Sequence, residues 1–424
     1  MLFNSISFFL FLSLVFILYW SPLSKTVNIR NLFLLISSYI FYGWWDYRFL
    51  TLIILSTVVD FFVGHYLFHS SSLRMKKILL YISLFTNFGI LGIFKYFNFF
   101  IENFIYAFSI IGININFTGL NIILPVGISF YTFQTLSYTI DIYRGTLKPT
   151  NNLLAFSTFI AFFPQLVAGP IERAANLLPQ FKILRKFDYK FALEGCWIIL
   201  RGLFKKIVIA DRLGEFVELV YDGNLISMDG SIVLMATILF AFQIYCDFSG
   251  YSDIAIGVAR LFGISLNKNF NMPYLATSFR DFWLRWHISL SSWFRDYVYI
   301  SIGGNRNKIT RNIIITFLLS GLWHGASWNF ICWGLMHSIL LIIERKLNFF
   351  LKDFDILFFK RLPSRIIVFT FVVLSWVFFR ANSLENAFYF FDLILFSKYN
   401  FSWILELGTI RLYNLIMGVF FILL

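Results

Sequence analysis

The most restrictive feature of the sequence is an uncharged stretch that runs from Asn312 to Ile343, NIIITFLLSGLWHGASWNFICWGLMHSILLII. At about 1.5 Å per residue it would form a straight helix of roughly 48 Å, whereas the hydrocarbon core of a bilayer is about 30 Å thick. We therefore expect it to break, tilt or divide into two elements. The glycine-rich middle, around Trp323-His324-Gly325, is the expected position of the break.

His324 is an ionisable side chain at membrane depth, which marks a candidate functional site. The alternative is a histidine that only hydrogen-bonds to a neighbouring helix. Small residues around it either leave room for a narrow substrate or allow close helix packing, and the sequence does not choose between these. They are Ser320, Gly321, Gly325, Ala326 and Ser327. His337 lies roughly 220° further round an unbroken helix, so the two histidines are not expected to form a metal pair.

Composition places the chain in a membrane. Hydrophobic residues make up 59% of it, charged residues only 13%, and the mean hydropathy is +0.76. The net charge of +13 does not indicate nucleic-acid binding, because the basic residues form short clusters between apolar segments, as cytoplasmic loops do. The isolated cysteines Cys196, Cys246 and Cys332 indicate neither a zinc site nor a disulfide framework.

Residues 1–120 are predicted to hold the N-terminal spans. We expect a retained first span rather than a signal peptide, and three further spans; the four are Leu2–Trp20, Asn31–Trp45, Phe49–Phe68 and Ile78–Phe94. Basic residues follow the first and third spans, which predicts an extracytoplasmic N-terminus. Asp60 and His65 are expected to face the interior of the helix bundle.

Prolines, glycines and polar residues interrupt the next segments. Pro125 and Gly127 precede a polar run that predicts a wet or protein-lined interior. The run comprises Ser129, Tyr131, Thr132, Gln134, Thr135, Ser137 and Tyr138. Pro164 and Gly169-Pro170 end the following apolar stretch, which makes a re-entrant segment plausible.

Charged residues set apart two later segments. Tyr189–Tyr221 carries too many charges for a central span, so an interfacial or strongly tilted helix is expected. Gly230–Cys246 is predicted to be a span that ends before Asp247 and Asp253. These two carboxylates would neutralise bases, cap the next helix or bind a ligand.

Phe279–Tyr299 has the pattern of one amphipathic helix at the membrane interface, with aromatic side chains on one face. The opposite face carries Arg280, Arg285 and Arg295, which either anchor the helix to anionic lipid or guide the phosphates of a substrate. His287 falls on the seam between the faces.

Towards the end of the chain, Ile366–Phe379 is predicted to be a span and Glu385–Phe396 a short helix. Leu412–Leu424 is an apolar run too short to cross a bilayer. We therefore expect the complete protein to continue beyond it.

Six motifs stand out together along the chain. They are LPVGISFYTFQTLSYTIDIYRG (124–145), FPQLVAGPIER (163–173), YCDFSGYSDIAIGVARLFG (245–263), FRDFWLRWHISLSSWFRDYVYISIGGNR (279–306), GLWHGASWNFICWGLMH (321–337) and WVFFRANSLENA (376–387). Together they resemble the membrane-bound O-acyltransferase superfamily, and in particular its bacterial branch of alginate O-acetylases, peptidoglycan O-acetyltransferases and teichoic acid D-alanyl transferases.

The resemblance implies an all-α polytopic protein with about eleven transmembrane or re-entrant helices in a ring around a thin, tunnelled core, together with interfacial amphipathic helices. We expect a single domain over residues 1–424, with the catalytic motifs in 121–390. The resemblance makes His324 the catalytic histidine and His287 the second histidine of this branch. The residues predicted to bind substrate are Trp323, Trp328, Arg285, Arg295, Asp296, Asp247 and Gln134.

The expected reaction carries an acyl group, most simply acetyl, from a cytoplasmic thioester such as acetyl-coenzyme A towards hydroxyls of an extracytoplasmic glycan. No metal and no permanently bound cofactor are expected. The resemblance also implies an extracytoplasmic SGNH-type transferase as partner and a location in the bacterial cytoplasmic membrane. Peptidoglycan or another surface glycan is the preferred acceptor, while a transporter or flippase and a recruiting scaffold are the alternative classes.

Overall fold

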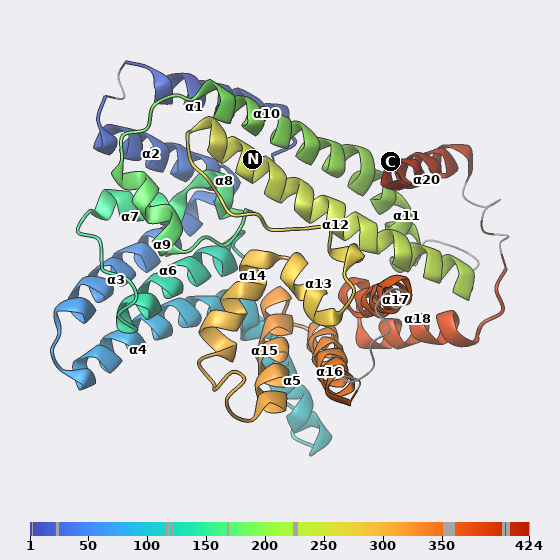
Figure 1. Ribbon diagram of the computed structural model, residues 1–424. Coiled ribbons are helices and arrows are strands. Elements are labelled where there is room, and N and C mark those ends of the chain that lie inside the picture. The colour runs from blue at the N-terminus through green and yellow to red at the C-terminus, as the bar shows by residue number, and fades with distance from the viewer. Residues whose placement is uncertain are drawn as a thin grey trace. The chain divides into compact units, whose positions relative to one another are not determined.

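A computed structural model describes residues 1, 3–22, 25–115, 117, 119–120, 122–167, 169–223, 228–350, 361–400, 403 and 408–423. Every regular element within these ranges is helical, as predicted (Figure 1). The chain divides into two compact units. The first unit comprises Met1–Ile199 with Ile254–Asn267, and the second comprises Leu200–Asp253 with Lys268–Leu424.

The first unit begins with a series of apolar helices. These are α1 (Ile6–Trp20), α2 (Val27–Asp46), α3 (Leu50–His69), α4 (Leu73–Leu91), α5 (Phe97–Ile110), α6 (Ile128–Tyr143), α7 (Leu153–Ala161), α8 (Phe163–Leu166) and α9 (Ala174–Leu177). Most of α10 (Tyr189–Leu203) and the last turns of α12 (Gly230–Leu261) complete this unit.

The second unit contains the remaining helices. These are α11 (Asp211–Tyr221), most of α12, α13 (Phe279–Arg285), α14 (Ile288–Trp293), α15 (Ile309–His324), α16 (Trp328–Phe350), α17 (Arg361–Arg380), α18 (Leu384–Phe396) and α20 (Gly408–Leu423). Its core is rich in aromatic side chains, with Trp333 and Trp376 among the largest that are fully buried.

Four helical stretches in the described residues are long and apolar enough to cross a membrane, and they are Val27–His69, Leu73–Ile110, Gly230–Leu261 and Leu362–Arg380. These four stretches are fewer than the predicted eleven helices. Two of the stretches each contain two consecutive α-helices, and several other helices are too short to cross a membrane. The number of about eleven and the central tunnel therefore stay predictions.

A buried polar network joins α3, α4 and α6 in the first unit. The side chain of Asp60 is fully buried and accepts hydrogen bonds from Ser83 Oγ, from Asn87 Nδ2 at 2.7 Å and from Thr139 Oγ1 at 3.0 Å. A carboxylate in an apolar interior requires such donors. The prediction that Asp60 faces the bundle interior is confirmed, whereas His65 is only half-buried. The whole polar run on α6 is also buried, as predicted.

The long uncharged stretch divides where expected. α15 ends at His324 and α16 begins at Trp328, and the two form a closely packed hairpin. Glycines at the contact explain the close approach, because a Cβ on Gly321 would lie 2.1 Å from Phe330 O and one on Gly334 would lie 2.3 Å from Phe317 O. Of the two readings of the small residues, close helix packing therefore holds for Gly321. It also holds for Gly325, whose Cβ would meet the Phe330 ring at 2.2 Å.

Two predicted elements were wrong in their extent. The stretch Phe279–Tyr299 is not one helix, because α13 ends at Arg285, α14 begins at Ile288, and a π-helical segment follows from Phe294 to Tyr299. The span that begins at Gly230 does not end before Asp247 but continues to Leu261. Asp247 and Asp253 therefore lie inside α12 and do not cap a following helix.

The glycine contact predicts a stability difference between two matched substitutions. Gly334→Ala places a methyl group against Phe317 O and should lower stability by about 1–3 kcal/mol, the usual cost of overpacking. Gly89→Ala lies on α4 with no atom within 4 Å of the new Cβ, so stability should stay the same or rise. Thermal unfolding of both variants in detergent measures the difference, and equal melting temperatures would contradict it.

The burial of Glu172, in the connection between α8 and α9, leads us to expect that the stability of the protein depends on pH. Glu172 is buried and accepts hydrogen bonds from Asn267 N at 2.5 Å and from Asn267 Nδ2 at 2.7 Å. Burial raises the pKa of Glu172 from 4.5 to about 7 against the opposing effect of these bonds. The folded state then binds more protons than the unfolded state between about pH 4.5 and pH 7, so stability should fall as pH rises through this window. Glu172→Gln should flatten that part of a melting-temperature profile, and an unchanged slope would contradict the assignment.

Candidate active site

His324 is the last residue of α15, at the break before α16. Its side chain is half-buried among aromatic rings. The imidazole centroid lies 5.0 Å from that of Trp333, 5.1 Å from that of Phe379 and 6.3 Å from that of Phe330. The aromatic contacts fix the ring in place, while the partial exposure leaves part of it accessible.

His287 occupies the second break, between α13 and α14. Its backbone is left-handed, with φ 41° and ψ 56°, a conformation that non-glycine residues rarely adopt. This geometry turns the side chain inward, where it is fully buried. The Nδ1 atom lies 3.1 Å from Asn269 Oδ1, and the backbone N–H of Ile288 donates to Asn269 O at 2.8 Å.

The hydrogen bonds around Asn269 determine the tautomer of His287. Asn269 Oδ1 accepts from the backbone N–H of Ser289 at 3.2 Å and from Ser289 Oγ at 2.9 Å, so this atom is the amide oxygen. It therefore accepts from His287 Nδ1–H as well. The lone pair then resides on Nε2, which is buried with no hydrogen-bond partner among the described residues. Burial lowers the pKa of His287 from 6.5 to about 3, which keeps the ring neutral at physiological pH.

The indole of Trp323 connects the two histidines. Its centroid lies 5.9 Å from the His287 ring and 5.0 Å from the His324 ring, with interplanar angles of 72° and 84°. His287 and His324, which lie at two different breaks between helices, thus both contact the indole of Trp323. The structure places both imidazoles in one aromatic site within the second unit.

His337 lies on the other side of Trp333. The Trp333 centroid is 4.9 Å from the His337 ring and 5.0 Å from the His324 ring. His337 Nε2 lies 3.0 Å from Ser375 Oγ, whose own hydroxyl donates to Val372 O. His337 is fully buried and supports Trp333. Within the described residues, no cluster of three histidine, cysteine or acidic side chains is arranged to hold a metal.

Other predicted binding residues form ion pairs with neighbours. Arg285 Nε lies 2.7 Å from Asp281 Oδ1, and Arg295 Nε lies 2.7 Å from Asp296 Oδ1. Asp247 Oδ1 lies 2.5 Å from Lys206 Nζ.

The second carboxylate of α12, Asp253, pairs with Arg201 at 3.0 Å and with Lys205 at 2.8 Å. Of the readings proposed for Asp247 and Asp253, neutralisation of bases is the one that the geometry realises.

The two remaining predicted binding residues are Trp328 and Gln134. The side chain of Trp328 is 50% exposed at the first position of α16. Gln134 is buried on α6, in the first unit. Their roles in binding stay predictions.

The sequence reasoning missed Asn269, Ser289 and Trp333. The alternating asparagines of LNKNFN (266–271) were a usable signal, because regularly spaced amides in an irregular segment often bond to other elements. Asn269 fixes His287, and the neighbouring Asn267 binds Glu172.

The described residues include helical stretches long and apolar enough to cross a membrane, and they bring the half-buried His324 and the fully buried His287 to the indole of Trp323. Helices of this length and apolarity are typical of a membrane protein. The family model of the membrane-bound O-acyltransferases (MBOAT) matches residues 147–391, and the chain belongs to this family. It is an O-acyltransferase.

Relatives match over most of the chain. A probable alginate O-acetylase AlgI of Azotobacter vinelandii is 40% identical over 91% of this chain and 76% of its own length. A peptidoglycan O-acetyltransferase of Helicobacter pylori is 37% identical over 91% of this chain and 78% of its own. A teichoic acid D-alanyltransferase of Bacillus subtilis is 31% identical over 55% of this chain and 61% of its own.

Asn269 provides a test of the tautomer. Asn269→Leu removes the acceptor that holds Nδ1–H, so we expect acyl transfer to fall by about 10²-fold or more while the protein stays folded. Asn269→Asp keeps an acceptor and adds charge, so it should retain more activity and shift the pH–rate profile, because a carboxylate favours the protonated ring. Equal activity of the leucine variant and the unaltered protein would contradict a positioning role.

Proposed function

We propose that this protein moves an acyl group, most simply acetyl, from a cytoplasmic thioester to hydroxyls of an extracytoplasmic glycan. The observation that carries the proposal is the meeting of His324 and His287 on the indole of Trp323. The names of the relatives, two of which are glycan O-acetylating proteins, support acetyl as the group and a glycan as the acceptor.

His324 is the proposed general base. A neutral imidazole has an unperturbed pKa near 6.5, so it accepts a proton from an attacking hydroxyl and returns it to a leaving group at ordinary pH. Its position in the last turn of α15 favours this role, because the negative end of a helix dipole stabilises a cationic imidazolium by about 0.3–1 kcal/mol.

The start of α16 supplies the complementary charge. Its N-terminal amides lie within a few residues of His324 and carry the positive end of the helix dipole. An oxyanion formed near His324 would be stabilised by these amides or by the indole N–H of Trp323.

His287 is the proposed positioning partner. Its Nε2 lone pair accepts a hydrogen bond, so it suits the acceptor hydroxyl or a polar group of the donor. Since the ring stays neutral, it orients this group without introducing a charge into the aromatic site.

The proposed reaction balances without any further reactant. The hydroxyl oxygen forms a bond to the thioester carbonyl carbon while its proton passes to His324. The C–S bond then breaks, and the thiolate takes the proton from the imidazolium. An ester and a free thiol result.

The donor we propose is acetyl-coenzyme A or a carrier-bound thioester, with no permanently bound cofactor. Peptidoglycan or another surface glycan is the preferred acceptor. An extracytoplasmic SGNH-type transferase is the proposed partner that completes the transfer. The proposed location is the cytoplasmic membrane with the N-terminus outside, because basic residues follow the first and third spans.

The test uses proteoliposomes with radiolabelled acetyl-coenzyme A inside and soluble glycan with the partner transferase outside. His324→Ala should reduce labelled ester by about 10²–10⁴-fold, the usual contribution of a general base. The matched control is His65→Ala, which removes a half-buried histidine of the first unit and should leave transfer unchanged. Normal transfer by the His324 variant would refute the mechanism, and glycan or precursor transport without ester formation would favour a transporter.

A further inference from the structure

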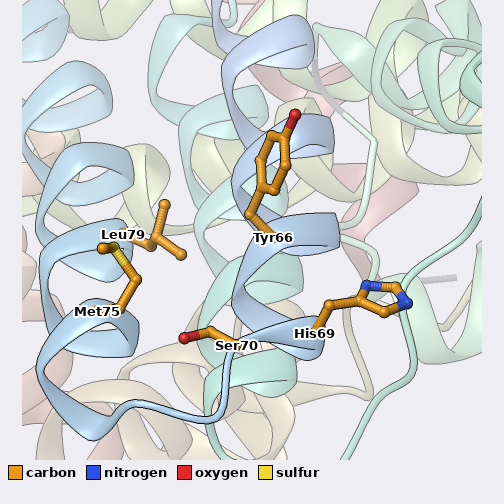
Figure 2. A pocket seen from close by; sticks show the side chains of 5 residues that line it. All are labelled: Tyr66, His69, Ser70, Met75 and Leu79. Carbon is orange, nitrogen blue, oxygen red and sulfur yellow. The ribbon is translucent and has the colours of Figure 1, made fainter.

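A groove of about 360 Å³ lies at the turn between α3 and α4, in the first unit. It is lined by Tyr66, His69, Ser70, Met75 and Leu79. Figure 2 shows Leu79 extending from α4 towards α3, which carries Tyr66, with Met75 running alongside α4, while the ring of His69 points away from α4. The walls are therefore mainly apolar and open to the surroundings.

The groove lies where this part of the protein meets the membrane surface. Its two helices belong to separate apolar stretches of spanning length, Val27–His69 and Leu73–Ile110. The short connection between them, residues 70–72, must consequently lie near one face of the bilayer.

Positive charge concentrates at this turn. Arg74, Lys76 and Lys77 lie in the first turns of α4, and no acidic residue occurs between Asp60 and Glu102. Asp60 itself is buried and bonded to α4 and α6. The hairpin thus offers three cations without a carboxylate of its own to neutralise them.

The three cations differ in their position relative to the groove. At about 100° per residue, Lys76 lies roughly 100° from Met75 and roughly 60° from Leu79 round α4, so it flanks the groove. Lys77 lies roughly 160° from both and faces the opposite side. Lys76 is half-buried whereas Lys77 is exposed, which agrees with these positions.

We propose that this groove binds an anionic phospholipid. The phosphate is held by Lys76, and an acyl chain lies along Tyr66, Met75 and Leu79. Cationic side chains at a membrane surface attract anionic headgroups, and long basic side chains reach the headgroup level by extending along the helix. The groove shares no residue with the histidine site, and the proposal does not depend on the proposed acyl transfer.

The test is native mass spectrometry of the full chain in detergent, titrated with phosphatidylglycerol. Lys76→Glu should weaken binding of the tightest lipid by about tenfold or more, because it replaces attraction with repulsion beside the phosphate. Lys77→Glu is the matched control, since it changes the same charge on the same turn and should alter binding less than about twofold. Leu79→Trp fills the groove without changing the charge and should also weaken binding.

Three results would overturn the proposal. Equal losses in the Lys76 and Lys77 variants would show a general electrostatic attraction instead of a site. Equal binding of phosphatidylcholine would show that the anionic charge has no role. Displacement of the lipid by inorganic phosphate at similar concentration would show that the groove binds a free anion and that its apolar walls contribute nothing.

Discussion

The arrangement of the candidate site depends on the close approach of α15 and α16. Glycines at the contact allow the two backbones to approach closely, and the non-helical residues Gly325–Ser327 connect the two helices. An unbroken helix would place His324 in mid-helix, where its neighbours' backbone groups are all paired. The break instead places His324 at the C-terminal end of one helix, four residues before the next helix begins. The negative end of one helix dipole and the positive end of the next are thus close to His324 along the chain.

The second break, between α13 and α14, positions the buried His287. His287 is fully buried, and a buried imidazole is costly unless its polar atoms are bonded. The left-handed backbone at this residue turns the ring towards Asn269, which holds one nitrogen and leaves the other with its lone pair. Strained backbone of this kind often accompanies functional positions. Aromatic side chains surround both histidines, and Trp323 lies between the two rings.

Much of this could be predicted from the sequence. Hydropathy predicted the apolar helices, the length of the uncharged stretch required a break near Gly325, and the motifs pointed to His324 and His287. The interior position of Asp60 also followed from the cost of an exposed carboxylate in lipid.

The two predictions of helix extent that were wrong depended on contacts with residues distant in the sequence. The break at His287 was missed because Phe279–Tyr299 keeps a helical pattern across it, whereas the hydrogen bonds to Asn269 that accompany the left-handed residue come from a distant segment of the chain. The continuation of α12 past Asp247 and Asp253 was missed because their charges suggested an end. Lys206, Arg201 and Lys205, on other helices, neutralise them within the helix. Periodicity reports the faces of a helix but not the partners that let it tolerate a charge or force it to break.

The central claim is that a thioester carbonyl binds where Trp323 separates the two imidazoles. A structure of the protein with a non-hydrolysable acetyl-coenzyme A analogue, in which a methylene replaces the thioester sulfur, tests it most directly. The account predicts that the analogue's carbonyl lies within hydrogen-bonding distance of His324 or of the amides at the start of α16. A carbonyl bound elsewhere, with Trp333 and Phe379 closing His324 off from the donor, would contradict it.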